Sequence, residues 1–126
     1  MTVFLVTAFL ILHGLLHLCV WATPVRSDKP PPFDPGHSWV LTAAHVSAAP
    51  ARVAVLLLAW FTTLVYVLAG AGVAAGAQWG PAAAVVAAMS GLVLKVIWFH
   101  PWLTFGVLLD AGVIAAVGSA WPGSLY

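Results

Sequence analysis

Charged side chains are scarce in this chain. Of its 126 residues, 6% are charged and 63% are hydrophobic. A soluble domain of this composition would lack the polar residues that must cover its core. The same scarcity leaves no basic surface for nucleic acid. The composition therefore predicts an integral membrane protein without a nucleic-acid partner.

Cysteine and the common catalytic motifs are also scarce or missing. Cys19 is the single cysteine, which excludes a dithiol or disulfide relay within the chain. The sequence has no glycine-rich phosphate loop and no nucleophile elbow. Residues 13–17, HGLLH, have the histidine spacing of a zinc protease but lack its glutamate, the general base, so protease activity is excluded.

Long apolar runs are what the chain has in abundance. A bilayer core of about 30 Å needs roughly 20 helical residues per crossing. Four runs meet this length, at residues 2–21, 51–75, 81–99 and 102–121. The first run is too long for a signal peptide and no basic residue precedes it, so we expect it to stay as a membrane helix. Residues 1–126 are thus predicted to form a single all-α membrane domain.

Prolines and short connections predict how these helices are arranged. Pro81 and Pro101 suit the first turn of a helix, where a missing N–H costs nothing. Residues 76–80 and 100–101 leave room only for tight turns, so consecutive helices should pack antiparallel. We predict an up-and-down bundle of four transmembrane helices with a long first loop, residues 22–50.

The long loop is predicted to have two parts. Its prolines indicate an extended segment at residues 29–36. After that segment, Ser38 can cap a short helix that lies on the membrane interface with Trp39 as its anchor. One face of that helix would carry His37, Leu41 and His45. The alternative is an irregular loop that carries two histidines.

The basic residues lie on one side of the predicted bundle. They occur in or beside the first and third connections, at Arg26, Lys29, Arg52 and Lys95. The second connection and both ends of the chain have none. By the positive-inside rule, we expect a multi-pass protein of the cell membrane with loops one and three in the cytoplasm and both termini outside.

Ionisable side chains at membrane depth are costly, so those within the runs mark a candidate site. His13 and His17 lie one turn apart in the first run, while Lys95 and Asp110 lie in the third and fourth. All four fall within roughly 12 Å of the predicted cytoplasmic helix ends, at about 1.5 Å per residue. The remaining histidines belong to the same half, namely His37, His45 and His100. We predict a polar cavity in the cytoplasmic half.

Several kinds of ligand suit such a cavity. Its candidate binding residues are His13, His17, His45, Lys95, His100 and Asp110. His13 and His17 could both ligate a metal ion such as Zn, Cu, Fe or Mn, with His100 or His45 as the third ligand and Asp110 as a ligand or its support. A haem would need an axial ligand from the opposite face, such as His100. A quinone in an aromatic-lined pocket is a third alternative. In the plainest alternative, the histidines only bond neighbouring backbone or reach to the interface.

Asp110 has two interpretations of its own. An ion pair with Lys95, or a contact with a histidine, would lower the cost of burying the charge in the membrane. An unpaired Asp110 should instead be protonated at neutral pH, and it could then couple the movement of a substrate to protons. We favour the paired arrangement, because both ions are then compensated within the bundle.

Three stretches carry a resemblance to known proteins. They are LHGLLHL at residues 12–18, FDPGHSW at residues 33–39, and residues 99–110, which begin FHPWL and end GVLLD. These stretches resemble those of small four-helix membrane proteins, and this resemblance implies the same fold but no established activity. In size and helix count the chain is also similar to the DoxX-like group. That second resemblance implies a quinone-linked or redox role.

Three functions of different kinds are compatible with the sequence. The first is a membrane-embedded site that binds a metal ion, haem or quinone-like ligand in a binding or redox role. The second is a proton-coupled transporter or channel for small molecules. The third is a non-catalytic accessory or lipid-binding subunit, with membrane lipids, a second copy or a larger membrane complex as its partners. We favour the first because histidines dominate the buried polar residues, and because small exchangers usually have an acidic residue in the first helix and balanced loop charges.

Overall fold

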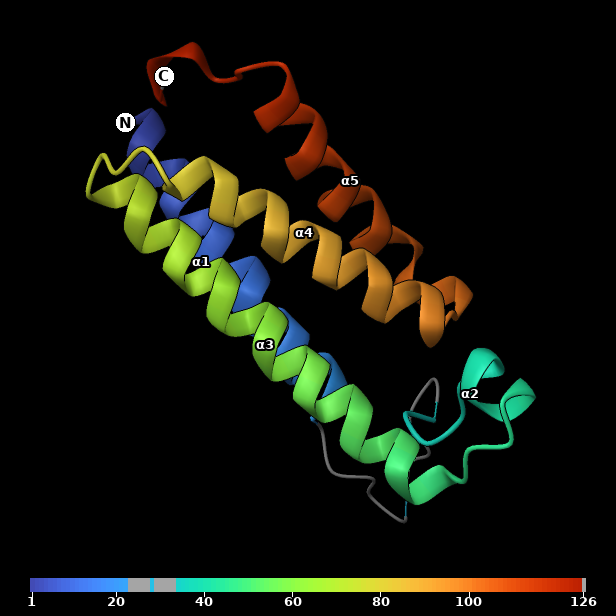
Figure 1. Cartoon of the computed structure of the whole chain (residues 1–126). Coiled ribbons are helices and arrows are strands. Elements are labelled where there is room, and N and C mark those ends of the chain that lie inside the picture. Colours follow the sequence, from blue (N-terminus) through green and yellow to red (C-terminus); the bar gives the residue numbers. More distant parts are fainter. Residues whose placement is uncertain (23–27, 29–33, 126) are drawn as a thin grey trace.

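All regular secondary structure in the part of the chain that the structure describes is helical. This computed structural model describes residues 1–22, 28 and 34–125 (Figure 1). Within them there is no strand, and the elements are α1 (Thr2–Trp21), α2 (Trp39–Ala43), α3 (Ala48–Ala74), α4 (Gly80–Ile97), η1 (Pro101–Leu103), α5 (Thr104–Gly118) and η2 (Gly123–Leu125). Arg26, Lys29 and most of the predicted extended segment lie outside the described residues.

Four of these segments are long and apolar enough to cross a membrane. They are α1, α3, α4 and the segment Pro101–Gly118, which joins η1 to α5. Consecutive spans run in opposite directions, so both termini lie at one end of the bundle and α2 lies at the other (Figure 1). The predicted all-α membrane fold with four spans is confirmed.

The ends of the spans differ from the predicted ones by a few residues. α3 begins at Ala48 rather than at residue 51, because the first turn of a helix tolerates Pro50. α4 ends at Ile97 rather than at residue 99, since His100 precedes a proline and is extended, with φ −144° and ψ 139°. α5 ends at Gly118, two residues before Ala120 takes a left-handed φ of 51°.

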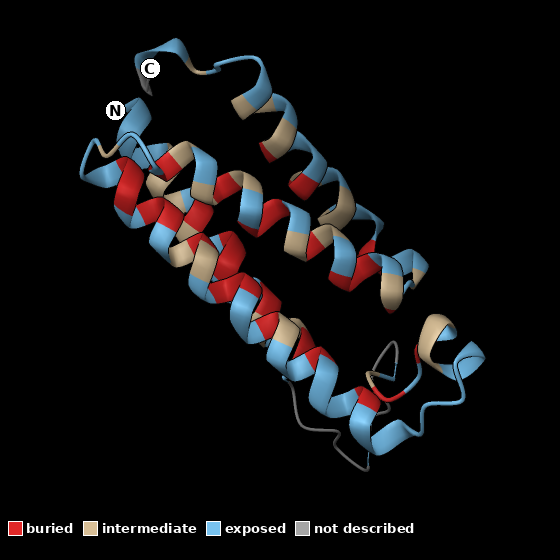
Figure 2. Cartoon of the chain, viewed as in Figure 1, coloured by how far each residue is buried: buried red, intermediate tan, exposed pale blue. Residues whose placement is uncertain are grey.

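The spans pack in the order α1, α3, α4, α5. Within the described residues, α1 packs along α3, α3 along α4 and α4 along α5, whereas α1 and α5 make few contacts. Buried residues therefore form stripes on the facing sides of the spans (Figure 2). Small residues permit close approach: a Cβ added to Gly80 would lie 2.8 Å from the backbone nitrogen of Val73. On the remaining side of the bundle, α1 and α5 are therefore not closely packed against each other.

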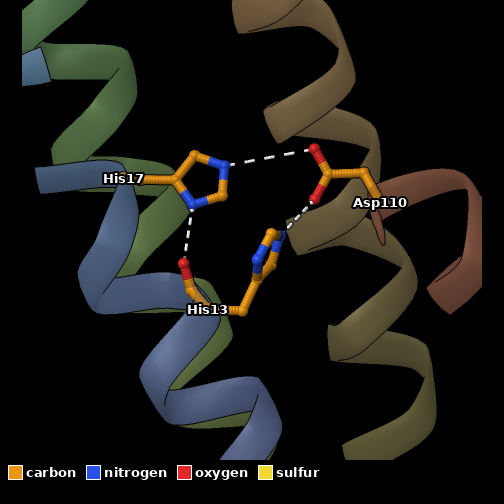
Figure 3. A group of neighbouring side chains, drawn as sticks. All are labelled: His13, His17 and Asp110. Carbon is orange, nitrogen blue, oxygen red and sulfur yellow. Dashed lines mark hydrogen bonds and ion pairs between the residues drawn. The ribbon is translucent and has the colours of Figure 1, made fainter. Parts of the chain in front are cut away.

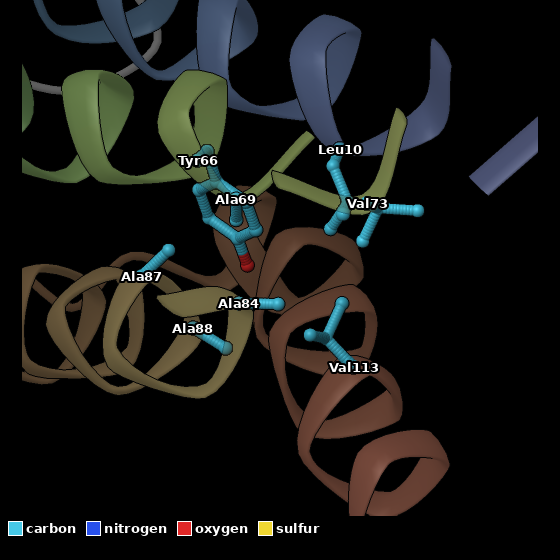
Figure 4. Close-up of a cluster of buried hydrophobic side chains, with 8 residues drawn as sticks. All are labelled: Leu10, Tyr66, Ala69, Val73, Ala84, Ala87, Ala88 and Val113. Carbon is cyan, nitrogen blue, oxygen red and sulfur yellow. The ribbon is translucent and has the colours of Figure 1, made fainter. Parts of the chain in front are cut away.

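A hydrophobic cluster ties all four spans together near the end that carries the termini. Its members are Leu10, Tyr66, Ala69, Val73, Ala84, Ala87, Ala88 and Val113 (Figure 4). Four of the eight are alanines, whose short side chains let α3 and α4 approach closely. Tyr66 is the only member with a polar side-chain atom, and its hydroxyl leads from this cluster to the polar site. A second cluster, around Trp21, Val55 and Trp98, lies toward the other end.

The described part of the first loop is fastened to the end of α4. Ser38 caps α2 by accepting a hydrogen bond from the Leu41 N–H at 3.2 Å, as predicted. Its hydroxyl also donates to the carbonyl of Ile97 at 2.6 Å, and the indole N–H of Trp39 donates to the carbonyl of Val96 at 2.7 Å. The last carbonyls of a helix have no partner inside it, so these two bonds satisfy two of the carbonyls at the C-terminal end of α4.

The predicted histidine face of α2 does not form. The helix ends at Ala43, and His45 lies beyond it with a left-handed φ of 60°. His37 precedes the cap and is exposed, as is His45. A five-residue helix is too short to align residues 37 and 45, so the prediction of a shared face was wrong.

Candidate functional site

Each of the four spans contributes a polar side chain to one buried site. His13 and His17 come from α1, Tyr66 from α3, Lys95 from α4 and Asp110 from α5. None of the five side chains is more than 5% exposed. The two histidines lie on the same face of α1 because four residues make about one helical turn. The structure thus brings together His13, His17, Lys95 and Asp110, as the depth of these residues predicted.

Asp110 is the centre of this site. Its Oδ1 accepts a hydrogen bond from the Tyr66 hydroxyl at 2.6 Å. The same oxygen lies 2.7 Å from Nε2 of His13, and Figure 3 shows this contact. Its Oδ2 accepts from Nζ of Lys95 at 2.7 Å. A fully buried carboxylate with a cation and two further partners is compensated within the protein. The paired interpretation of Asp110 is therefore confirmed, and the unpaired one was wrong.

Lys95 places its ammonium between α1 and α5. Its Nζ has three acceptors: Oδ2 of Asp110 at 2.7 Å, Nε2 of His17 at 2.8 Å and the carbonyl of Gly91 at 3.4 Å. An ammonium group has three N–H donors, so each of them has a partner. Lys95 is consequently held in one position by groups from three different spans.

The contacts of His17 define its tautomer. Its Nδ1 lies 3.0 Å from the carbonyl of His13, which can only accept, so Nδ1 carries the hydrogen. Its Nε2 faces the Lys95 ammonium, which can only donate, so Nε2 is the acceptor. His17 is therefore a neutral imidazole with both nitrogens engaged.

His13 is held differently and keeps one nitrogen without a partner. The carboxylate of Asp110 accepts, so Nε2 of His13 carries the hydrogen in their 2.7 Å contact. The ring stacks on Phe9, with centroids 5.5 Å apart, and meets the Tyr66 ring edge to face at 5.0 Å. Nδ1 of His13 is the one buried side-chain nitrogen or oxygen of the described residues that has no hydrogen-bond partner.

Three glycines on three spans leave the space that the site occupies. A Cβ added to Gly91 would lie 2.5 Å from Oδ2 of Asp110, and one added to Gly106 would lie 2.6 Å from Cε of Lys95. A Cβ at Gly14 would lie 2.6 Å from Cβ of Tyr66. Atoms cannot approach this closely without a shift. One glycine each from α1, α4 and α5 therefore leaves room for the side chains of the site.

Tyr66 is the site residue that sequence reasoning missed. Tyrosine and tryptophan in membrane helices are expected at the interfaces, and there they need no further explanation. Tyr66 lies far from both ends of α3, in the middle of a run of apolar residues, and it is fully buried. A tyrosine away from the membrane interfaces was the signal in the sequence that could have indicated a hydrogen-bonded role.

His45 and His100 stand apart from the other predicted site residues. His45 is exposed beyond α2. His100 caps η1, where its Nδ1 accepts a hydrogen bond from the Trp102 N–H at 3.2 Å. The group of described residues whose ligand atoms lie within 4.8 Å of one another is His13, His17 and Asp110, without His100.

These three residues could hold a metal ion, but Lys95 would compete with it for two of them. Imidazole and carboxylate ligands together suit several transition metals. The Lys95 ammonium lies 2.7 Å from Asp110 and 2.8 Å from His17, where it bonds the same atoms that would bind a metal. A bound ion would have to displace this internal cation.

Two cavities lie between α1 and α5, one on each side of Leu109. The first, of about 370 Å³, is lined by His13, His17 and Lys95 together with apolar residues such as Trp102, Phe105 and Leu109. The second, of about 380 Å³, is lined only by apolar residues and glycine, among them Phe9, Leu10, Leu108, Leu109 and Val113. We call them the polar cavity and the apolar cavity. Searches against protein-family models, curated proteins and solved structures find no match to this chain.

Proposed function

We propose that this protein binds a quinone-like, lipid-soluble ligand between α1 and α5. The polar ring of the ligand would lie in the polar cavity against His13 and Lys95, and its apolar tail would lie in the apolar cavity. The observation that carries the proposal is that both cavities share Leu109, so a buried charged network and a wholly apolar space adjoin on one side of the bundle.

The dimensions and lining of the cavities support a small organic ligand. Ligand pockets are typically about 300–1,000 Å³, mostly apolar, with a few placed polar groups. The polar cavity fits this description, because three ionisable side chains interrupt an otherwise apolar wall. Each cavity is large enough for one part of an amphipathic molecule, and together they suit a ring joined to a tail.

The side between α1 and α5 also supports entry from the lipid. Several side chains that line the cavities are exposed on that side: Leu16 by 54%, Phe105 by 71% and Leu108 by 63%. In a membrane, such apolar residues face acyl chains rather than water. A ligand dissolved in the bilayer would therefore reach both cavities laterally, without crossing the bundle.

The hydrogen bonds favour an organic ligand over haem or a metal ion. A haem with two axial histidines would need two imidazole nitrogens with free lone pairs, but both nitrogens of His17 are engaged and only Nδ1 of His13 lacks a partner among the buried side chains of the described residues. A metal ion would compete with Lys95 for Asp110 and His17. A quinone-like ring needs neither two free imidazole lone pairs nor the displacement of Lys95. With the orientation that the basic residues predict, this site lies in the cytoplasmic half of the membrane.

Binding can be tested with a decyl-substituted benzoquinone and the protein in detergent micelles. Tryptophan fluorescence is the readout, because Trp102 lines the polar cavity and Trp121 the apolar one. We expect saturable quenching. Gly112→Leu should weaken binding about tenfold, equivalent to about 1.4 kcal/mol, because the new side chain takes the space of the tail.

Gly118→Leu is the matched control. Both glycines lie on α5, and an added Cβ at either position meets no other atom within 4 Å in the described structure, so neither variant should unfold the protein. Gly118 does not line either cavity. The proposal fails if the wild-type protein shows no saturable quenching, or if both variants bind as tightly as the wild type. An equal loss in the two variants would place the tail elsewhere.

A further inference from the structure

His13 has a buried nitrogen that the rest of the site does not use. Its side chain is 5% exposed, and Nδ1 has no hydrogen-bond partner in the described residues. Leaving a buried polar atom unpaired is costly, and native structures rarely do so without a functional reason. His13 also lines the polar cavity, so a ligand in this cavity lies against the ring that carries the unpaired nitrogen.

The neighbours of His13 decide whether Nδ1 donates or accepts. Nε2 carries a hydrogen because it faces the carboxylate of Asp110, which also accepts from Tyr66 and Lys95. A second hydrogen on Nδ1 would make His13 a cation. The charges of Asp110 and Lys95 already balance, so that cation would leave a net positive charge buried in the membrane. Nδ1 is therefore a lone pair, and it needs a donor.

The other polar groups of the site are donors that already have acceptors. Lys95 donates to Asp110, His17 and the Gly91 carbonyl. Nδ1 of His17 donates to the backbone, and the Tyr66 hydroxyl donates to Asp110. A quinone carbonyl, which can only accept, finds no remaining donor on these three side chains. A hydroxyl group, in contrast, can donate to Nδ1 of His13.

We infer that the ligand of the polar cavity carries a hydroxyl group that donates a hydrogen bond to Nδ1 of His13. The site then prefers a hydroquinone or phenol over the corresponding quinone. Asp110 is a positioning residue in this arrangement, because its contact with Nε2 fixes that nitrogen as the donor and leaves the lone pair on Nδ1. The inference rests on the proposed function and specifies which chemical form of the ligand is recognised.

The test compares three decyl-substituted probes: the hydroquinone, its dimethyl ether, which keeps the aromatic ring but cannot donate, and the quinone. Binding is measured by tryptophan quenching under anaerobic conditions. For the wild-type protein we expect the hydroquinone to bind about tenfold more tightly than either of the others, the difference that one buried hydrogen bond makes. The ether separates the loss of the donor from any effect of the redox state.

Two variants assign the preference to a single atom. In His13→Gln, the amide nitrogen can take the place of Nε2 and donate to Asp110, while the acceptor at Nδ1 is lost. The three probes should then bind with about equal affinity. Thr63→Val removes another buried bond to α1, from Oγ1 to the Gly14 carbonyl at 2.8 Å, and Thr63 lines neither cavity. This control should keep the full preference.

The outcomes separate the inference from the proposal on which it rests. If the wild-type protein binds all three probes equally, the inference is overturned while the ligand site stands. A preference that persists in His13→Gln also overturns it, because another group must then accept the hydroxyl. If no probe binds the wild-type protein, the proposed function fails and the inference with it. Collapse of the preference in His13→Gln alone supports both.

Discussion

Replacing Gly91 with alanine should disrupt the buried site from its centre. A Cβ at this position would lie 2.5 Å from Oδ2 of Asp110, 3.0 Å from its Cγ and 3.1 Å from Nε2 of His17. The carboxylate of Asp110 cannot simply turn away, because it is held by Lys95, Tyr66 and His13. The methyl group must therefore displace the carboxylate or push α4 and α5 apart.

The expected loss of stability follows from these two possible displacements. Overpacking a well-filled interior costs about 1–3 kcal/mol. Breaking a buried ion pair costs about 3–5 kcal/mol, and the methyl group weakens the bond from Lys95 to Asp110 without removing either charge. Alanine also recovers about 1 kcal/mol of helix propensity relative to glycine. We expect Gly91→Ala to lower the free energy of unfolding by about 2–4 kcal/mol.

Gly112→Ala is the matched control, because the same substitution should not lower the stability there. Gly112 also lies within a span, but a Cβ there meets no other atom within 4 Å in the described structure. This variant should be unchanged or more stable by up to about 1 kcal/mol. Both free energies can be measured by reversible unfolding in mixed micelles, with helical circular dichroism as the signal. If the two variants show the same stability, the close approach of Gly91 to Asp110 does not exist in the protein.

Two further predictions concern the partners of Asp110. Tyr66→Phe removes a hydrogen bond to a charged group and keeps the ring, so it should lower the free energy of unfolding by about 1.5–3 kcal/mol. Thr63→Val loses a bond to a neutral carbonyl and should cost only about 1 kcal/mol; equal losses would mean that Asp110 carries no charge. Lys95→Met removes the internal cation from the group formed by His13, His17 and Asp110, so the variant should bind Co²⁺ with visible absorption bands while the wild-type protein does not. Cobalt binding by the wild type, or none by the variant, would contradict this.

The fold and the axial position of the site could be predicted from the sequence. Apolar runs of sufficient length predict the spans, because a bilayer core admits little else. A constant rise per residue then predicts the depth of each polar side chain, which is why His13, His17, Lys95 and Asp110 were expected together. Depth and cost alone also favoured an ion pair for Asp110.

The rotation of each span and the shape of the connections could not be predicted in this way. Depth counted from the predicted cytoplasmic end of its span places Tyr66 about 22 Å into the membrane, well beyond Asp110 at about 12 Å, and it does not show which way the Tyr66 hydroxyl points. That direction depends on close approaches such as the one at Gly14, which are properties of two helices rather than of one. His100 and His45 were expected at the site from their depth, but local backbone geometry placed them elsewhere: the residue before Pro101 is extended, and α2 ends early.

The order of the charged partners along the chain affects how the helices assemble in the membrane. Lys95 lies in the third span and Asp110 in the fourth, so the cation is synthesised before the carboxylate that compensates it. Lys95 lies in the last turn of α4, where it opposes insertion by less than the about 2.5–3.5 kcal/mol that a lysine costs at the centre of a span. Before the fourth span arrives, the long side chain of Lys95 can reach from this turn toward the membrane interface. A chain truncated after residue 100 should therefore still insert its third span, and the ammonium group should turn into the bundle only when Asp110 joins it. One ion pair thus couples the packing of one helix to the synthesis of the next.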